Sequence, residues 1–156
     1  METIQDRFIR HEGLRLKPYK DSKGIWTIGV GHNIEADKVM LKRLEELKIH
    51  GITKDYALSL LNQDIADHAK KLILALPWIE KLDDNRASVL LDMSFNMGVG
   101  NEKRGLLSFK YTLKLIRTGM YKIASSNILK SQYAKDVGKR AIENAKIIET
   151  GELQEV

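Results

Sequence analysis

The fold is decided by residues 11–32, HEGLRLKPYKDSKGIWTIGVGH, where a helix gives way to a small sheet. The stretch begins at the end of an amphipathic segment, residues 3–12, which Thr3 is suited to cap and which a glycine ends. Turn-forming residues follow at 21–24, and the β-branched and aromatic run at 25–30 predicts a returning strand. We therefore predict a helix followed by a hairpin or a three-stranded antiparallel sheet.

Apolar residues recur at helical spacing through most of the remaining chain. The segment 53–75 would be about 34 Å long at 1.5 Å per residue, which is long enough to connect two lobes. We predict a single domain over 1–156 with an α+β, mainly helical fold. Its lobes are a sheet-bearing one at about 14–55 and a helical one at about 1–12 and 76–156. The other predicted helices cover 37–48, 84–97 with Asp84 as the cap, 105–117, 120–131 and 138–149.

Composition places the chain among soluble globular domains. Hydrophobic residues make up 43% of the 156 residues and charged residues 30%. No run of about eighteen apolar residues and no secretory signal is recognisable, so no stable membrane insertion is expected. Zero cysteines exclude disulfides, thiolate metal sites and cysteine nucleophiles. The net charge of +5 favours anionic partners, although interspersed charges fit an ordinary soluble surface equally well.

Glu12 is the first candidate for catalysis. At 100° per residue it falls about 40° from Phe8, inside the apolar stripe of the first helix. A carboxyl group on a buried helix face tends to keep its proton, which suits a general acid. The alternative is that Glu12 points past the edge of the core or pairs with an arginine.

Asp21 and Thr27 lie on the predicted hairpin. An aspartate at such a turn often only bonds its own backbone, and a threonine in a strand often only fills space. The combination of Glu12 and Asp21 makes a catalytic role for Asp21 a stronger hypothesis. Glycosidases place one carboxyl group in an apolar setting, where it stays protonated, and another in a polar setting, where it stays ionised. Thr27 is then placed to hydrogen-bond a water molecule.

These residues carry a resemblance to a known family. Residues 11–16, 19–21 and 26–32 resemble the catalytic signature of phage-type lysozymes, the endolysins of the T-even bacteriophage kind. The order Glu, eight residues, Asp, five residues, Thr matches that family's catalytic triad. The likeness covers nearly the whole chain, with further matches at 51–55, 62–64, Arg86 with 95–98, Asn127 with 130–131, and 139–141 with 150–151.

The resemblance implies a lysozyme-like two-lobed fold and a muramidase. Such enzymes hydrolyse the β-1,4 bond between N-acetylmuramic acid and N-acetylglucosamine in peptidoglycan, without a cofactor or a metal. Glu12 would be the general acid, and Asp21 with Thr27 would position or activate the attacking water. Inversion at the anomeric carbon is implied, which requires carboxyl groups roughly 6.5 to 9.5 Å apart.

The resemblance also implies a set of supporting residues. His32 and Asp64 would form a histidine–carboxylate pair, which agrees with the usual structural role of a histidine beside a sheet. Arg140 would lie near the acid glutamate. Substrate-binding positions are Asn33, Phe95, Thr112 and Asn127; Asn33 and Thr112 differ in type from the best-known member, and Phe95 is equally explained as a core aromatic.

Partners and location follow from the same resemblance. We expect a monomer that stays in the host bacterial cytoplasm until lysis, is released by a separate membrane-permeabilising protein, and then acts on the cell wall.

Histidines at 11, 32, 50 and 68 do not have the spacing of a zinc site. The alternatives are a basic helical nucleic-acid-binding domain, a wall-binding module without catalysis, and a transglycosylase that uses the glutamate alone. No nucleic-acid partner is expected, because the basic residues are not gathered on one helix.

Overall fold

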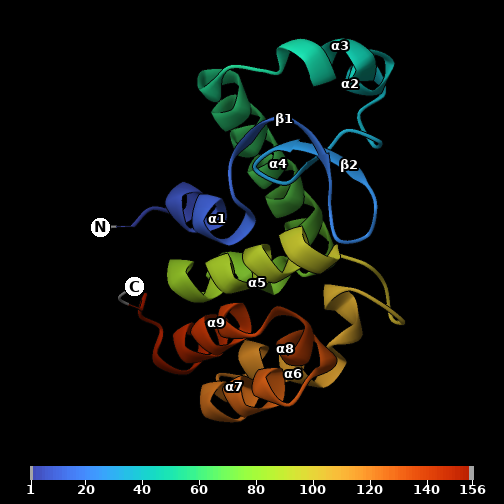
Figure 1. Ribbon diagram of the computed structural model, residues 1–156. Helices are drawn as coiled ribbons and strands as arrows, with labels where there is room; N and C mark the ends of the chain where they lie inside the picture. Colours follow the sequence, from blue (N-terminus) through green and yellow to red (C-terminus); the bar gives the residue numbers. More distant parts are fainter. Residues whose placement is uncertain (1, 155–156) are drawn as a thin grey trace. The chain divides into compact units, whose positions relative to one another are not determined.

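The computed structural model describes residues 2–154, which divide into two compact units (Figure 1). The first unit extends to Asp67 and contains the sheet, and the second begins at His68 and is helical. The helix α4, Lys54–Ala75, runs from the first unit into the second. The predicted α+β class, mainly helical with a small antiparallel sheet, is confirmed. The predicted lobe boundaries stay a prediction.

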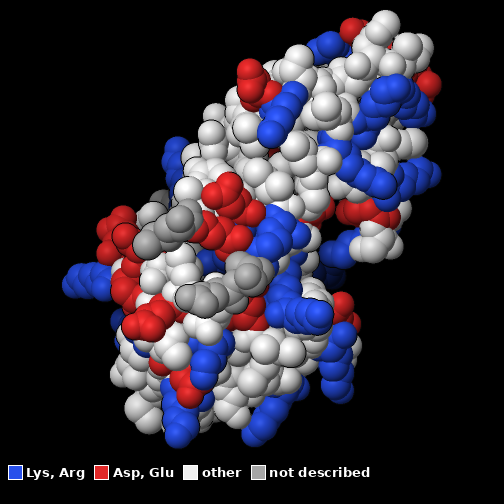
Figure 2. Space-filling view, turned by 60° about the vertical axis from the view of Figure 1, so that its left-hand side comes forward, with Lys and Arg blue, Asp and Glu red and all other residues white. Residues whose placement is uncertain are grey.

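Charged side chains of both signs share the surface. The face drawn in Figure 2 carries Lys and Arg in several separate places, with Asp and Glu among them. A nucleic-acid-binding domain typically gathers its basic residues into one patch or stripe. The distribution on this face is unlike that arrangement.

The first helix, α1, covers Ile4–Glu12 and begins with a capping box. The Thr3 hydroxyl accepts a hydrogen bond from the Asp6 amide at 3.1 Å, and the Asp6 carboxylate accepts one from the Thr3 amide at 3.0 Å. These two hydrogen bonds with Thr3 hold the pKa of Asp6 below its usual value. Gly13 ends the helix at a positive φ of 79°. The predicted helix and its cap are confirmed.

The sheet has three antiparallel strands in the order β1, Arg15–Lys20; β2, Trp26–Gly29; and β3, His32–Asn33. Thr27 lies opposite Tyr19 on one side and opposite Asn33 on the other. The Ile52 amide donates to the Leu16 carbonyl at 2.8 Å, beside β1. Gly51 must be glycine, because a Cβ there would lie 2.5 Å from that carbonyl oxygen and its φ is +67°.

Two short helices stand where one was predicted. α2 covers Lys38–Lys42 and α3 covers Leu44–His50, so the single helix predicted at 37–48 is wrong. The chain breaks at Arg43, which leaves the helical conformation with φ −102° and ψ 12°. Apolar spacing does not reveal this break, because Met40 and Leu47 are seven residues apart and would share one face of an unbroken helix too.

The core of the first unit lies between the sheet and these helices. It contains the buried side chains of Ile28, Ile34, Met40 and Leu47, with Trp26, Leu44, Ile52 and Leu60 packed against it. The Lys48 ammonium lies 4.5 Å from the centre of the Trp26 ring, a cation–π contact that covers the exposed side of the indole. The hairpin is therefore held by the burial of Ile28 in this core and by the contact of Lys48 with Trp26.

The second unit is built from short helices. α9 packs against α5, α7 and α8, and α6 packs against α7. Asp83, and not the predicted Asp84, caps α5, because its carboxylate accepts from the Arg86 amide at 3.0 Å. The prediction missed α8 and both 3₁₀ helices. The elements are η1, Pro77–Lys81; α5, Asp84–Met97; η2, Leu106–Ser108; α6, Lys110–Arg117; α7, Tyr121–Leu129; α8, Gln132–Val137; and α9, Lys139–Thr150.

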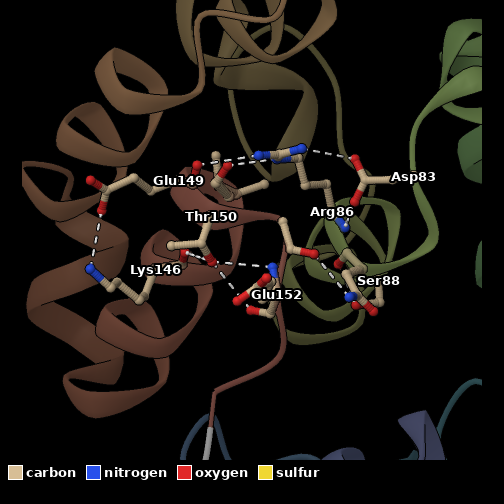
Figure 3. Close-up of polar contacts among 10 residues, drawn as sticks. Asp83, Arg86, Ser88, Lys146, Glu149, Thr150 and Glu152 are labelled. Carbon is tan, nitrogen blue, oxygen red and sulfur yellow. Dashed lines mark hydrogen bonds and ion pairs between the residues drawn. The ribbon is translucent and has the colours of Figure 1, made fainter.

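Arg86 holds the end of α9 (Figure 3). Its Nε donates to the Ile148 carbonyl at 2.7 Å, and Nη2 donates to the Glu149 carbonyl at 3.2 Å. The guanidinium also pairs with Asp83 at 3.1 Å and lies 3.4 Å from the centre of the Tyr121 ring. A cation at carbonyls of a helix C-terminus satisfies acceptors that have no partner within the helix. α5 and α9 are therefore joined by a specific polar contact as well as by their packing.

Candidate active site

The hairpin turn holds Asp21 and Thr27 through one intervening residue, Ile25. The Asp21 Oδ1 accepts from the Lys23 amide at 2.8 Å and from the Ile25 amide at 2.9 Å. The Ile25 carbonyl accepts from the Asp21 amide at 3.0 Å and from the Thr27 hydroxyl at 2.8 Å. No hydrogen bond from residues 2–154 reaches Oδ2 of Asp21. The structure therefore brings these two predicted residues into one turn and leaves one carboxylate oxygen available.

Glu12 is the last residue of α1, and its side chain is half-buried. Its charge acts on Tyr19 in β1: the pKa of the Tyr19 hydroxyl is raised first by burial, then by Glu12 and Asp21, against the opposing charge of Arg15. The Arg15 guanidinium lies 4.5 Å from the centre of the Tyr19 ring. Tyr19 thus lies within the electrostatic field of both carboxylates. Sequence reasoning did not single out Tyr19 as a member of this group.

His32 lies between two carboxylates. Its Nδ1 is 2.7 Å from Asp64 Oδ2 in α4, and its Nε2 is 2.9 Å from Asp37 Oδ2. A neutral imidazole has a single N–H, so only the protonated ring donates to both. The hydrogen bond with Asp64 raises the pKa of His32, burial opposes the rise, and the bond with Asp37 adds to it. The predicted pairing of His32 with Asp64 is present.

Asp37 has a second function in the same cluster. Its Oδ1 accepts from the Met40 amide at 3.2 Å and so caps α2. Burial raises the pKa of Asp37, but the hydrogen bonds from His32 and from the backbone outweigh it and hold the pKa below its usual value. From the sequence, Asp37 was recognised only as the start of a predicted helix. Its position five residues after His32 was the signal that could have indicated a contact between the two side chains.

Arg140 belongs to a buried polar cluster in the second unit. Its Nε and Nη2 donate to the two oxygens of Asp92, at 3.1 and 2.9 Å. Asn144 donates to Asp92 and to the Tyr133 hydroxyl, each at 2.8 Å. The side chain of Asp92 is fully buried, and that of Arg140 is 10% exposed. The placement of Arg140 near Glu12, which the resemblance implies, stays a prediction.

Asp92 and Asn144 were missed by the sequence analysis. Asp92 follows Val89, Leu90 and Leu91 in α5, all of them buried. A charged residue inside a buried stripe requires a partner of opposite charge, because a lone buried charge is very costly. That signal was present in the sequence, although it does not identify Arg140 as the partner.

The four predicted substrate-binding residues lie in different settings. Asn33 is exposed in β3 and accepts from the Ala36 amide at 3.0 Å. Phe95 is half-buried in α5, with its ring centre 5.1 Å from that of His68. Asn127 is half-buried in α7, whereas Thr112 in α6 is only 7% exposed and has little surface for a substrate. Their roles stay predictions.

Residues 2–154 contain neither a candidate metal-binding group nor a candidate membrane span. No group of three or more histidine, aspartate or glutamate side chains in this range is arranged to hold a metal ion. No helix in the same range is both long and apolar enough to span a bilayer.

Comparisons with known proteins show the family of the chain. The family model for phage lysozyme matches residues 9–146. The probable T4-type lysozyme 1 of Dictyostelium discoideum is 30% identical, over 98% of this chain and 97% of its own length. An endolysin of Acyrthosiphon pisum secondary endosymbiont phage 1 is 32% identical, over 84% and 78%. A SAR-endolysin of Enterobacteria phage P21 is 29% identical, over 79% and 65%. The chain belongs to the phage lysozyme family and is a glycoside hydrolase of the lysozyme type.

Proposed function

We propose that the chain is an endolysin that hydrolyses the β-1,4 bond between N-acetylmuramic acid and N-acetylglucosamine in bacterial peptidoglycan. Membership of the phage lysozyme family supports the reaction class. The observation that carries the residue assignment is the geometry of the hairpin, in which Asp21 and Thr27 both bond to Ile25, while α1 ends at Glu12 directly before the first strand. The causes that raise the pKa of Tyr19, with burial first and then the charges of Glu12 and Asp21, are consistent with this grouping.

Glu12 is the general acid in this proposal. It protonates the glycosidic oxygen as the bond breaks, and the departing sugar leaves with a free hydroxyl. Its position as the last residue of α1, directly before the strand that leads to Asp21, supports the assignment.

Asp21 and Thr27 position the attacking water. Asp21 accepts its backbone hydrogen bonds on Oδ1, so that Oδ2 can take a proton from water. The Thr27 hydroxyl donates to the Ile25 carbonyl, and its lone pairs remain able to accept from the same water. Attack from the face opposite the leaving group inverts the anomeric carbon, with the two carboxyl groups roughly 6.5 to 9.5 Å apart.

Further roles complete the proposal. His32 with Asp64 supports the sheet, and Arg140 supports the general acid. Asn33, Phe95 and Asn127 bind the glycan, and Thr112 contributes only the small part of its side chain that is exposed. The enzyme works as a monomer, needs no cofactor, stays in the host cytoplasm until a separate protein permeabilises the membrane, and then acts on the wall. Fractionation of cells that express the full chain, with and without such a permeabilising protein, tests this location.

The decisive experiment analyses the glycan released from purified peptidoglycan. Glu12→Gln and Asp21→Asn should each lower the rate by about 10²- to 10⁴-fold while the protein stays folded. Asn at position 21 keeps an oxygen that can accept both backbone hydrogen bonds, so a loss of activity would come from the lost charge. The Thr27→Val variant should hydrolyse peptidoglycan slowly. The Thr27→Ser variant should keep more of the activity because it retains a hydroxyl group. The exposed Glu45→Gln serves as the control.

The products decide between the proposal and its alternatives. Hydrolysis leaves a reducing sugar, transglycosylation leaves an anhydro sugar, and a binding module leaves the glycan intact. NMR of the first-formed anomer reports inversion or retention. An active Glu12→Gln variant, or an anhydro product, would overturn the assignment.

A further inference from the structure

A groove in the second unit plays no part in the proposed reaction. It lies between η1 and α6, and its volume of about 390 Å³ is within the usual range of ligand-binding pockets. Leu76, Trp78 and Leu113 contribute apolar surface to it. Trp78 is only partly buried, so its indole remains accessible at the groove. The groove is therefore a shallow apolar site with an aromatic ring in its wall.

The rim of this groove carries charge of one sign. Lys110, Lys114 and Arg117 line it, and no Asp or Glu is among its lining residues in the described part of the chain. These three cations follow the spacing i, i+4, i+7 and form a stripe along α6. Lys110 also lies 3.4 Å from Glu102, but both side chains are mostly exposed, so this pair is weak.

The other face of α6 is occupied by the core. Thr112 and Ile116 are buried and lie far around the helix from Lys114 and Arg117. The cationic stripe is thus not needed to pack the helix.

A second groove in the same unit shows that this charge pattern is not a general property of the surface. That groove, with a volume of about 490 Å³, is lined by Lys139 and Lys146 but also by Glu143 and Glu149. Its charges balance, so it does not select an anion. The groove between η1 and α6, by contrast, is lined by three cations and no carboxylate among the described residues.

The combination of groups indicates the ligand. A soluble anion needs the cations but not the indole and leucines, and an uncharged lipid needs the apolar surface but not the cations. Tryptophan is favoured at the level of lipid headgroups, and Lys or Arg near a membrane surface is attracted to anionic lipids. The cations and the indole of this groove together fit the headgroup region of a membrane that contains anionic lipid.

We propose that the groove between η1 and α6 docks the enzyme on a membrane surface that contains anionic phospholipid. Lipid phosphates bind Lys110, Lys114 and Arg117, and the glycerol and upper acyl region contacts Trp78 and Leu76, which are both partly exposed. The contact is peripheral and requires no spanning segment. It does not depend on the proposed cleavage of peptidoglycan.

Vesicle sedimentation with the full chain tests this proposal. The protein should bind vesicles of phosphatidylcholine with phosphatidylglycerol and should not bind phosphatidylcholine alone. Lys114→Gln/Arg117→Gln should weaken binding roughly 30-fold. The matched control is Lys122→Gln/Lys135→Gln, which removes the same charge from exposed positions in the same unit and should change binding less than threefold.

Further measurements separate the groove from general charge attraction. The tryptophan emission should shift to the blue on vesicles, and the shift should be lost in Trp78→Phe, which leaves Trp26 in place. Both double variants should digest purified peptidoglycan at the unaltered rate, so a failure of docking is distinguishable from a failure of the proposed reaction. Equal weakening by the two double variants, a blue shift that persists in Trp78→Phe, or full displacement by millimolar inorganic phosphate would overturn the proposal.

Discussion

The two units each hold a cation against carboxylate groups, but in different ways. In the first unit His32 lies between Asp64 and Asp37, and its side chain is 13% exposed. In the second unit the Arg140 guanidinium donates to both oxygens of the fully buried Asp92 carboxylate. A guanidinium keeps its charge at any pH that proteins meet, whereas an imidazole gains or loses its charge near neutrality. The first cluster is therefore sensitive to pH, and the second is a permanent part of the core.

Removal of Asp92 should have the largest effect on stability. Asp92→Ala removes the buried carboxylate that accepts from both Arg140 and Asn144. We expect the free energy of unfolding to fall by about 3–5 kcal/mol, measured by denaturant titration. Asp136→Ala, at an exposed position bonded only to Gln132, should cost about 0.5 kcal/mol or less. A loss below about 1 kcal/mol for Asp92→Ala would show that the second cluster is not held by this charge pair.

Removal of Asp64 should have a smaller effect, because the first cluster keeps its second carboxylate. Asp64→Ala removes the 2.7 Å bond to His32 but leaves the bond to Asp37. We expect a loss of about 2 kcal/mol at a pH where His32 is charged, since both partners are largely shielded from water. Asp67→Ala, three residues along α4 and exposed, is the matched control. Equal losses for the two variants would mean that Asp64 contributes no more than a surface residue.

These clusters also show which features the sequence could predict. The Thr3 cap and the Asp21 turn rest on contacts within four residues, and such local chemistry is readable from the order of residues. The pairing of His32 with Asp64 was supplied by the family resemblance and by no pattern in the chain. The pairing of Arg140 with Asp92 spans 48 positions, and its partner depends on how α5 and α9 pack.

Errors in helix boundaries have the same origin. Asp83 and Asp84 are equally good caps by residue type, and only the backbone geometry that brings the Arg86 amide to Asp83 decides between them. The break at Arg43 was missed because it does not interrupt the apolar spacing. α8 was missed because its six residues make less than two turns and bury only Tyr133, which is too little to show a helical period. The contacts of Asp21 and Thr27 with Ile25 follow from residues that lie close together in the chain, and the catalytic roles of these residues stay predictions.

The pH dependence of stability should distinguish the two clusters directly. The pKa of His32 is raised on folding, so its protonation stabilises the folded state. This contribution to the free energy of unfolding is fully present below the unfolded pKa of about 6.5, and it is lost as the pH rises through the pKa of the folded state. The lowered pKa of Asp37 acts in the other direction, and its contribution is lost as the pH falls through the folded value. His32→Gln should therefore flatten the fall in unfolding free energy above about pH 6.5, and His50→Gln should not. A difference between wild type and His32→Gln that is constant with pH would contradict the protonated, doubly bonded ring.

The smallest effect should come from a pair that resembles Arg140 and Asp92 in chemistry but not in burial. Arg43 lies 3.2 Å from Glu46, with side chains that are 50% and 56% exposed. Water screens this pair and solvates either partner when the other is removed, so Arg43→Gln should leave the denaturation midpoint unchanged within error. Asp92→Asn, measured alongside, removes one charge from an ion pair of almost the same length, 2.9 Å, and should lower the midpoint clearly. Because the contacts are so alike in length, a difference between the two midpoints would be due to burial, and equal midpoints would remove burial as the reason that the second cluster is stable.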